Sequence, residues 1–432
     1  MKARGSREAV LEGRVRDLTH GGDAVVETER GLVLARGALP GERVQVRLAG
    51  RAAGAQRGTL LAVSGPSEDR VSAPCAHAEA CGGCPLMTLA RPAQGRFKRE
   101  RLRALLAQRG SQLEPELVES RHPLGYRARA RLSFRAQAGG PARIGYHAAG
   151  SRSLLDVAHC LVLSPALAAG YARLREQLAA WLRGAGEIAL GVGAEQRCVI
   201  ELRTEAPQPP ELYRAAAALA ECDEVAGVSL RIGPHDEGST ATWGDPRQLA
   251  QGADGLPLLA PAGAFMQANP EVNAALVRYV AALAETTGAR VLELYAGHGN
   301  FSVLLARGAA ELRAVESDRA AADACRENLR VRAMEHARVV CEHAARGAAG
   351  KGRLDVAVLD PPRAGARDVL PVLLSRAPAR IVYVACDLAS LRRDLAELVQ
   401  AGYRVDAAAA FDMFPQTTHL ESVVRLNRGG RP

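Results

Sequence analysis

A cysteine stands where an apolar segment gives way to a helical pattern near the end of the chain. The segment IVYVAC (381–386) has the composition of a buried strand and ends on Cys386, and LASLRRDLAELVQ (388–400) has the spacing of an amphipathic helix. Asp387 lies between them and suits the N-cap position. A thiol beside the first turn of a helix is near the positive end of the helix dipole, which favours the thiolate. We expect a reactive Cys386; a buried, inert cysteine is the ordinary alternative.

Other polar residues end apolar segments in the same part of the chain. From about residue 263, strand and helix patterns alternate, which predicts an α/β fold with a doubly wound parallel sheet. The predicted strands end at Tyr295, Glu316, Asp360 and Cys386. Ligands of such sheets bind beyond the carboxyl ends of the strands. We therefore expect these four residues to lie at one site.

The stretch ELYAGHGN (293–300) predicts a strand, a turn containing Gly297 and then a helix. Glu316 ends the following strand, 19 residues beyond Gly297. Glycine allows the backbone to approach a ligand closely, and an acidic residue at the second strand end binds ribose hydroxyls. The pattern favours an adenosine-containing cofactor. Without a third glycine a dinucleotide is disfavoured and S-adenosylmethionine is the natural candidate; a purely structural turn is the alternative.

Two prolines follow Asp360 in VLDPPRAG (358–365). Proline lacks the N–H donor and fixes φ, so this loop is stiff and stays outside the sheet. A carboxylate there is able to accept hydrogen bonds from a base or a cofactor. The alternative is a helix cap followed by a turn.

A thiolate and a methyl donor together indicate one reaction. Carbon C5 of uracil is a poor nucleophile, but addition of a thiolate to C6 converts the ring to an enolate whose C5 attacks a methyl sulfonium. A base must then remove the C5 proton. The segment DMFPQTTHLESVV (412–424) offers Glu421 for this step, at the start of the last predicted strand. A surface carboxylate is the alternative.

Three cysteines cluster in CAHAEACGGC (75–84), with the spacing C-x5-C-x2-C, and Cys160 follows later in the chain. Four thiolates from Cys75, Cys81, Cys84 and Cys160 suit either Zn²⁺ or an iron–sulfur cluster, and the spacing does not decide between them. The nine cysteines of the chain do not suggest a disulfide framework.

The composition of the 432-residue chain narrows the class of protein. A net charge of +9 favours a polyanionic partner, with nucleic acid first. The start of the chain has no apolar signal segment, and no run reaches the roughly 18 apolar residues of a membrane span. We expect a cytoplasmic location and no membrane contact.

Three regions are expected along the chain. Residues 1–66 contain five short alternating strands, typical of a small closed β-barrel of the OB type. Residues 67–262 hold the cysteine loop, a basic amphipathic helix at 93–110 and a central α+β domain, and residues 263–432 form the parallel-sheet domain. The helix offers five cations as possible RNA contacts: Arg96, Lys98, Arg99, Arg101 and Arg103. A solvated basic face is the alternative.

In combination, these motifs resemble the RNA uracil-5-methyltransferase family whose members have a TRAM barrel, a [4Fe–4S] cluster and a class I (Rossmann-like) methyltransferase domain. The similarity extends from about residue 8 to 428 and includes ALPGERVQV (38–46), typical of the TRAM domain, and GAFMQAN (263–269). The resemblance implies cluster ligands, cofactor contacts and catalytic groups at these positions: Cys75, Cys81, Cys84 and Cys160 for the cluster; Gln267, Tyr295, Gly297, Asn300, Glu316 and Asp360 at the cofactor and base; Cys386 as nucleophile and Glu421 as base.

The resemblance implies methylation of a uridine in structured RNA, and the architecture is that of the 23S rRNA branch. Methylation of the tRNA T-loop is the close alternative. The family often has Ser-Cys-Asn-Pro around its nucleophile, where this chain has Ala385-Cys386-Asp387-Leu388. That change motivates a hypothesis of another class, an RNA-binding chaperone that no longer catalyses; a small-molecule methyltransferase with a zinc module is a third. We expect a monomer, because one large RNA partner requires no symmetry.

Overall fold

The computed structural model describes residues 9–52, 54–233, 238–350 and 352–429. Contacts divide the chain into two compact units. The first contains residues 1–97, 146–157 and 414–419, and the second contains residues 98–145, 158–413 and 420–432. The three domain boundaries expected from the sequence stay predictions.

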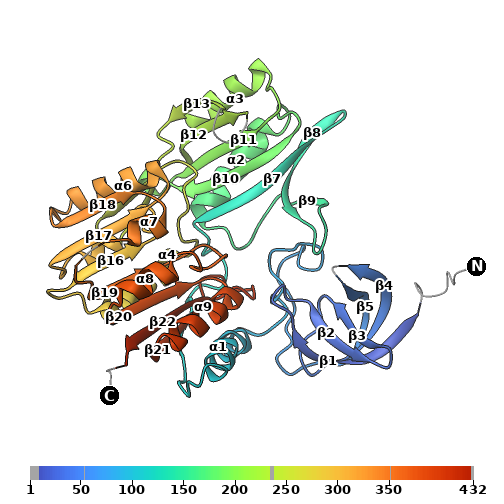
Figure 1. Ribbon diagram of the computed structural model, residues 1–432. Coiled ribbons are helices and arrows are strands. Elements are labelled where there is room, and N and C mark those ends of the chain that lie inside the picture. Colours follow the sequence, from blue (N-terminus) through green and yellow to red (C-terminus); the bar gives the residue numbers. More distant parts are fainter. Residues whose placement is uncertain (1–8, 53, 234–237, 351, 430–432) are drawn as a thin grey trace, which may run out of the picture. The chain divides into compact units, whose positions relative to one another are not determined.

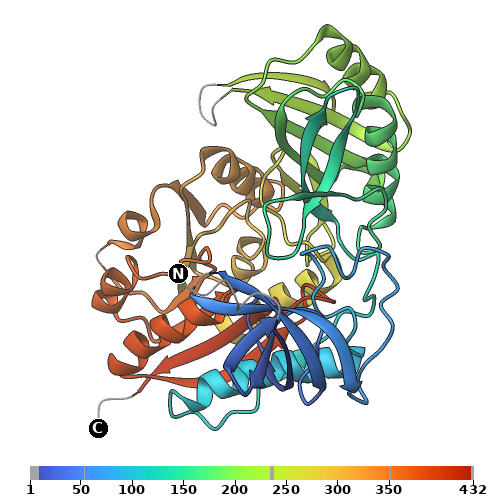
Figure 2. The same cartoon turned by 90° about the vertical axis from the view of Figure 1, so that its right-hand side faces the viewer.

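The first unit holds a closed five-stranded barrel, whose strands curve around a common interior in Figures 1 and 2. The strands pair in the order β1-β2-β3-β5-β4, and β4 closes the barrel against β1. Alternate side chains such as Val15, Val26 and Val44 fill the interior. The barrel expected from the sequence is confirmed. Its strands are β1 (Val10–Leu18), β2 (Ala24–Thr28), β3 (Gly31–Ala35), β4 (Arg43–Ala52) and β5 (Ala55–Gly65).

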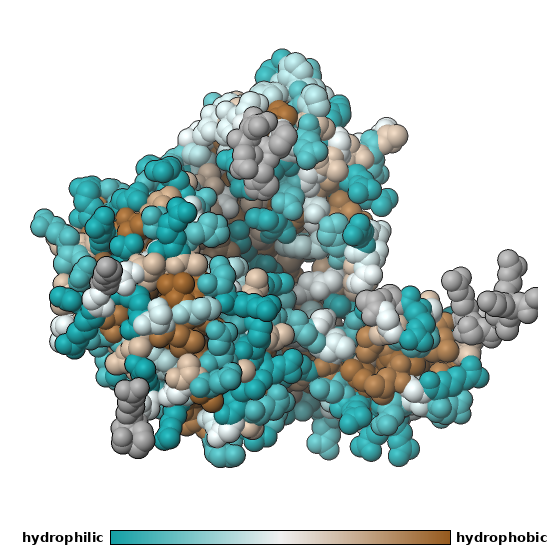
Figure 3. Space-filling model, in the orientation of Figure 1, coloured by the Kyte–Doolittle hydropathy of each residue, from teal (hydrophilic) through white to brown (hydrophobic). Residues whose placement is uncertain are grey.

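Some apolar side chains remain on the outside of the barrel. Leu32 is 53% exposed and Val10 is 50% exposed. Figure 3 shows brown, apolar surface over the strands of the barrel.

A seven-stranded sheet of order β13-β12-β11-β10-β7-β8-β9 forms the centre of the chain. Helices α2 (Pro165–Leu178) and α3 (Pro210–Ala220) contact its strands. A hairpin of β14 (Gln248–Gln251) and β15 (Pro257–Ala260) follows the sheet, and a short 3-10 turn, η1 (Ala194–Gln196), precedes β11. The sheet strands are β7 (Arg129–Gln137), β8 (Gly140–His147), β9 (Leu154–Asp156), β10 (Ala185–Val192), β11 (Cys198–Thr204), β12 (Val225–Ile232) and β13 (Ser239–Gly244).

The last part of the chain forms an eight-stranded sheet of order β18-β17-β16-β19-β20-β22-β21-β6. The strands are β6 (Glu116–Val118), β16 (Arg290–Leu294), β17 (Glu311–Glu316), β18 (Ala337–Cys341), β19 (Val356–Leu359), β20 (Arg380–Ala385), β21 (Tyr403–Phe411) and β22 (Glu421–Arg428). The helices are α1 (Arg91–Ala107), α4 (Pro270–Ala284), α5 (Ser302–Leu305), α6 (Arg319–Arg330), α7 (Ala344–Ala348), α8 (Leu370–Arg376) and α9 (Leu388–Gln400). Leucines of α1, α8 and α9 share one buried cluster with β16, β19 and β20.

The expectation of a wholly parallel sheet is wrong for one strand. Strands β16 to β20 are parallel, but β22 is antiparallel to both β20 and β21. Residues 412–420, which link β21 to β22, contain no helix. A parallel return needs a crossover of about a dozen residues or more, usually a helix, so this short link returns the chain as an antiparallel strand. The mixed α/β class itself is confirmed.

The basic helix is observed as α1, but several of its cations already have partners. Lys98 is fully buried, and its Nζ lies 2.5 Å from Oδ1 of Asp412. Arg96 and Arg103 each form an ion pair with a carboxylate. The prediction of an RNA contact is therefore wrong for Lys98.

Candidate active site

Four predicted residues lie where expected, at the carboxyl edge of the parallel strands. Tyr295 follows β16, Glu316 ends β17, Asp360 follows β19 and Cys386 follows β20. These strands are neighbours in the order β17-β16-β19-β20. The sheet therefore gathers residues that are nearly a hundred positions apart in the sequence.

Cys386 occupies the joint between β20 and α9, and Asp387 is the N-cap of α9 as predicted. The Asp387 carboxylate accepts a hydrogen bond from Ser390 N at 2.8 Å. The expected thiolate, however, is not favoured in the ligand-free protein. Burial, and then the carboxylates of Glu421 and Asp360, raise the pKa of Cys386 to about 12. These effects outweigh the favourable field of the helix terminus.

Glu421 reaches the same edge because β22 is antiparallel. Ala385 pairs with Ser422 in the β20–β22 ladder, so the next pair along is Cys386 and Glu421. Glu421 is only 4% exposed, and burial followed by the Asp360 charge raises its pKa well above the usual range. Burial also raises the pKa of Asp360 to about 7. The site thus combines a thiol and two carboxyl groups in poorly solvated surroundings.

Arg363 is the counter-charge of this edge. Its guanidinium lowers the pKa of both Cys386 and Glu421, although burial has the larger effect on each. Arg363 lies in the loop that follows the two prolines and is exposed. The cation is therefore positioned by the loop rather than by a strand.

Helix α9 holds this proline loop in place. The Asp394 carboxylate accepts hydrogen bonds from Ala366 N at 2.8 Å and from the Tyr383 hydroxyl at 2.6 Å. Arg393 Nη2 donates to the Ala364 carbonyl at 2.7 Å. Sequence reasoning missed these residues; an acidic residue on the inward face of a helix, as Asp394 is, was the available signal.

The glycine turn after β16 has open space above it. Gly297 has φ of 56°, and a Cβ at this position would meet no atom within 4 Å. Its N–H donates to Glu316 Oε2 at 2.9 Å, while Glu316 Oε1 accepts from Asp318 N at 2.7 Å. Tyr295 also has positive φ, at 63°, which is unusual for a residue with a side chain. The turn is therefore specifically shaped, and Glu316 is oriented toward it.

A buried carboxyl group lies under this turn and was missed from the sequence. Glu293 is 1% exposed, and the Ser302 hydroxyl donates to its Oε2 at 2.5 Å. Its Oε1 has no hydrogen-bond partner among the described residues. Burial raises the pKa of Glu293 to about 8, so the neutral acid is favoured. An acidic residue inside a buried strand pattern was the signal.

Gln267 and Asn300 also belong to this region. The Oε1 atom of Gln267 is buried without a hydrogen-bond partner in the described part of the chain. The segment is fixed at Ala268, whose carbonyl accepts from Ala128 N at 2.8 Å. Asn300 forms a reciprocal amide pair with Asn273 of α4, at 2.9 and 3.0 Å. Sequence reasoning did not single out Asn273.

None of the four cysteines predicted to bind a cluster forms a disulfide, and each is partly exposed. Cys75, Cys81 and Cys84 belong to the first unit and Cys160 to the second. Within the described ranges, no group of three or more His, Cys, Asp or Glu side chains is arranged to hold a metal ion. The cluster stays a prediction.

Comparison with known proteins identifies the family. A sequence model described as tRNA (Uracil-5-)-methyltransferase matches residues 259–429. The 23S rRNA (uracil(1939)-C(5))-methyltransferase RlmD of Chromohalobacter salexigens is 35% identical over 98% of this chain and 90% of its own length. The Halomonas elongata protein of the same name is 36% identical over 98% of this chain and 89% of its own length. The chain belongs to the RNA uracil-C5 methyltransferase family.

Family membership confirms the predicted enzyme class, an S-adenosylmethionine-dependent RNA methyltransferase. A crystal structure shares the fold: that of the Pyrococcus abyssi tRNA (uracil-54, C5)-methyltransferase with S-adenosyl-L-homocysteine. It has a TM-score of 0.74, 24% identity, and coverage of 96% of this chain and 100% of that chain. Among the described residues, no helix is both long and apolar enough to cross a membrane.

The raised pKa of Asp360 predicts a pH-dependent stability. The folded protein favours the protonated acid, so the contribution of Asp360 to stability is present near pH 4 and is lost as the pH rises through about 7. We expect Asp360→Asn to raise the free energy of unfolding by about 2 kcal/mol at pH 8 and not at pH 4. Urea unfolding at both pH values measures this, with the exposed Asp368→Asn as control. A variant less stable than the parent at pH 8 would contradict the assignment of a desolvated carboxyl group.

Proposed function

We propose that this protein methylates C5 of a uridine in 23S rRNA. The observation that carries the proposal is the similarity to 23S rRNA enzymes at 35% and 36% identity over almost the whole chain. A tRNA substrate is the second candidate, because the solved enzyme with the same fold acts on tRNA. The protein would act in the cytoplasm and as a monomer.

Residues around the glycine turn fit the cofactor. The open space above Gly297 leaves room for a ligand against the backbone. Glu316 would accept hydrogen bonds from ribose hydroxyls, and the unpartnered Oε1 of Gln267 would accept one from the cofactor. Tyr295 and Asn300 would complete the cofactor contacts. S-adenosylmethionine, when bound, supplies an electrophilic methyl group.

Cys386 would act as the nucleophile. Its sulfur gives up a proton and forms a bond to C6 of the uracil, so that the electron pair of the C5–C6 double bond is delocalised as an enolate and C5 becomes nucleophilic. The thiol has a raised pKa, so deprotonation requires help on substrate binding. The Arg363 guanidinium favours the thiolate, and Asp360 would hydrogen-bond the uracil edge and keep the ring in place.

Glu421 would be the base of the second half-reaction. After methyl transfer, its carboxylate takes the proton from C5, the C5–C6 double bond re-forms and the bond from C6 to the Cys386 sulfur breaks. The register supports this role: Ala385 pairs with Ser422, which brings the adjoining residues Cys386 and Glu421 to the same edge, and the base and the nucleophile act on adjacent carbons. Burial raises the pKa of Glu421, which makes it a stronger base than an exposed carboxylate.

We also propose that Cys75, Cys81, Cys84 and Cys160 hold a [4Fe–4S] cluster. Four cysteine thiolates are the donor set that such clusters require, and none of these four cysteines forms a disulfide. No catalytic step is assigned to the cluster.

Methyl transfer from labelled S-adenosylmethionine tests the proposed substrate. We expect label in 5-methyluridine from unmodified 23S rRNA, and at least about tenfold less from unmodified tRNA. Digestion of each RNA to nucleosides identifies the product. Label confined to tRNA would replace the rRNA proposal with the second candidate.

Glu421→Gln should separate the two halves of the reaction. Addition of Cys386 and methyl transfer do not require the base, whereas release does, so a covalent RNA–protein adduct should persist in denaturing gels. Turnover should fall by about 10² to 10⁴-fold. The matched variant Glu421→Gln/Cys386→Ala should form no adduct, and Cys386→Ala alone should retain RNA binding without methyl transfer. Methyl transfer by the Cys386→Ala variant would exclude this mechanism. If the unsubstituted protein transferred no methyl group but still changed the structure of RNA, the chaperone hypothesis would be favoured.

Metal analysis tests the cluster. We expect about four iron atoms per chain and a brown colour after anaerobic purification. Cys84→Ser and Cys160→Ser should each lose most of the iron, whereas Cys222→Ser, outside the proposed set, should keep it. Stoichiometric zinc in the parent protein would overturn the proposal.

A further inference from the structure

The central seven-stranded sheet has two unlike faces. Apolar residues such as Leu132, Ile188 and Leu202 lie in register across β7, β10 and β11 and are buried. Gly170 of α2 packs against Cys198 of β11, so the helices cover this face. The residues that alternate with these along each strand point to the opposite face of the sheet, away from the helices.

The face away from the helices is strongly basic, and residues 246–263 cover part of it. It carries six arginines from four strands and two glutamates, Glu187 and Glu201. The arginines are Arg129, Arg131 and Arg135 on β7, Arg143 on β8, Arg203 on β11 and Arg231 on β12. We call these eight residues the basic face.

The two glutamates neutralise only part of this charge. Arg131 lies 3.6 Å from Glu187, and Arg203 lies 2.9 Å from Glu201. In the described part of the chain, the other four arginines have no ion pair. An excess of four positive charges therefore remains on one side of one sheet.

Two pairs of arginines are directly opposed across neighbouring strands. Arg135 pairs with Arg143, and Arg203 pairs with Arg231. Like charges in this position destabilise a sheet, so the arrangement brings no benefit to the isolated fold. An anion bound between them would remove the repulsion.

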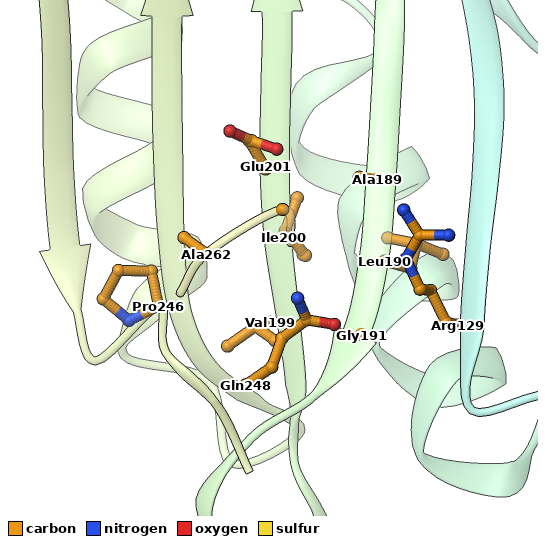
Figure 4. A pocket seen from close by; sticks show the side chains of 11 residues that line it. Arg129, Ala189, Leu190, Gly191, Val199, Ile200, Glu201, Pro246, Gln248 and Ala262 are labelled. Atoms are coloured by element: carbon orange, nitrogen blue, oxygen red, sulfur yellow. The ribbon is translucent and has the colours of Figure 1, made fainter. Parts of the chain in front are cut away.

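A small pocket lies on the same face. In Figure 4, Arg129, Glu201 and Gln248 surround the pocket above the strands, and Gly191 and Ala189 form its small-residue floor. Burial, and after it the charges of the neighbouring arginines, lower the pKa of Arg129 to about 10.

The basic face is continuous with the cofactor region. Arg129 Nε donates to the Ala264 carbonyl at 3.2 Å, three residues before Gln267. From Arg129 to Arg135 the face extends about 20 Å along β7 at roughly 3.3 Å per residue. An RNA whose target uridine lies at Cys386 would therefore be able to contact the arginines of β7, which extend away from the cofactor segment.

We propose that the basic face binds the sugar–phosphate backbone of the RNA substrate beside the target uridine. The proposal rests on the proposed function and adds a surface to it. Guanidinium groups bind phosphate in bidentate fashion, and the exposed Thr242 on the same face adds a neutral donor. Such contacts supply affinity and register rather than sequence choice.

The triple variant Arg135→Ala/Arg143→Ala/Arg231→Ala tests the surface. Among the described residues these arginines have no carboxylate partner that the variant would leave behind, so the variant should unfold at no lower temperature than the parent. Its dissociation constant for transcribed 23S rRNA should rise about 10- to 50-fold at fixed salt. The slope of log affinity against log salt should become shallower by about 2 to 3.

A charge-matched control lies on the helix-covered side of the same sheet. Arg173→Ala/Arg183→Ala/Arg214→Ala removes three exposed arginines and the same net charge. RNA affinity should change less than about twofold. Equal effects of both triples would overturn the proposal in favour of unspecific charge, and no effect of either would exclude the basic face as a docking surface. Methyl transfer by the parent is scored separately, so failure of the proposed function is distinguished from failure of the surface.

Discussion

The candidate active site depends on one constraint, the poor solvation of side chains at the carboxyl edge of the sheet. A thiol and two carboxyl groups share this edge, and desolvation is the largest influence on the pKa of each. Burial therefore shifts each of these three acids toward its protonated form. One exposed cation, Arg363, favours the charged forms. If Cys386 is the nucleophile, as proposed, its deprotonation must therefore be favoured by groups that arrive with the substrate.

Strand direction makes this shared edge possible. If β22 ran parallel to β20, Glu421 at its start would lie at the opposite end of the sheet from Cys386. The antiparallel return places the first residue of β22 beside the residue that follows β20. Helix α9 contributes at the same edge, because hydrogen bonds of Asp394 and Arg393 fix the loop that carries Arg363. The proposed nucleophile, the proposed base and a cation thus come from three segments that helix α9 and the antiparallel strand β22 hold together.

Local patterns in the sequence were sufficient to predict the strand ends and the helix cap, but not the ionisation of the site or the direction of β22. Strand ends at Glu316, Asp360 and Cys386 and the cap at Asp387 follow from apolar runs and capping preferences, which act within a few residues. The ionisation of Cys386 was mispredicted because a helix terminus is visible in the sequence, whereas burial and the approach of Glu421 are tertiary. The direction of β22 was missed because an apolar run has no direction of its own. Lys98 was assigned to solvent because its partner, Asp412, is more than three hundred positions away.

The same reasoning separates charge from function. A net charge of +9 says that cations are in excess, but the ion pairs decide which of them are available. Helix α1 appears basic in sequence and directs Lys98 inward, while β7 alternates arginine with buried apolar residues and directs its cations outward. Backbone contacts at such a face add binding energy for any RNA of suitable shape. Choice of one uridine must then come from the poorly solvated edge itself, where only a base that has left its stack is able to reach both Cys386 and Glu421.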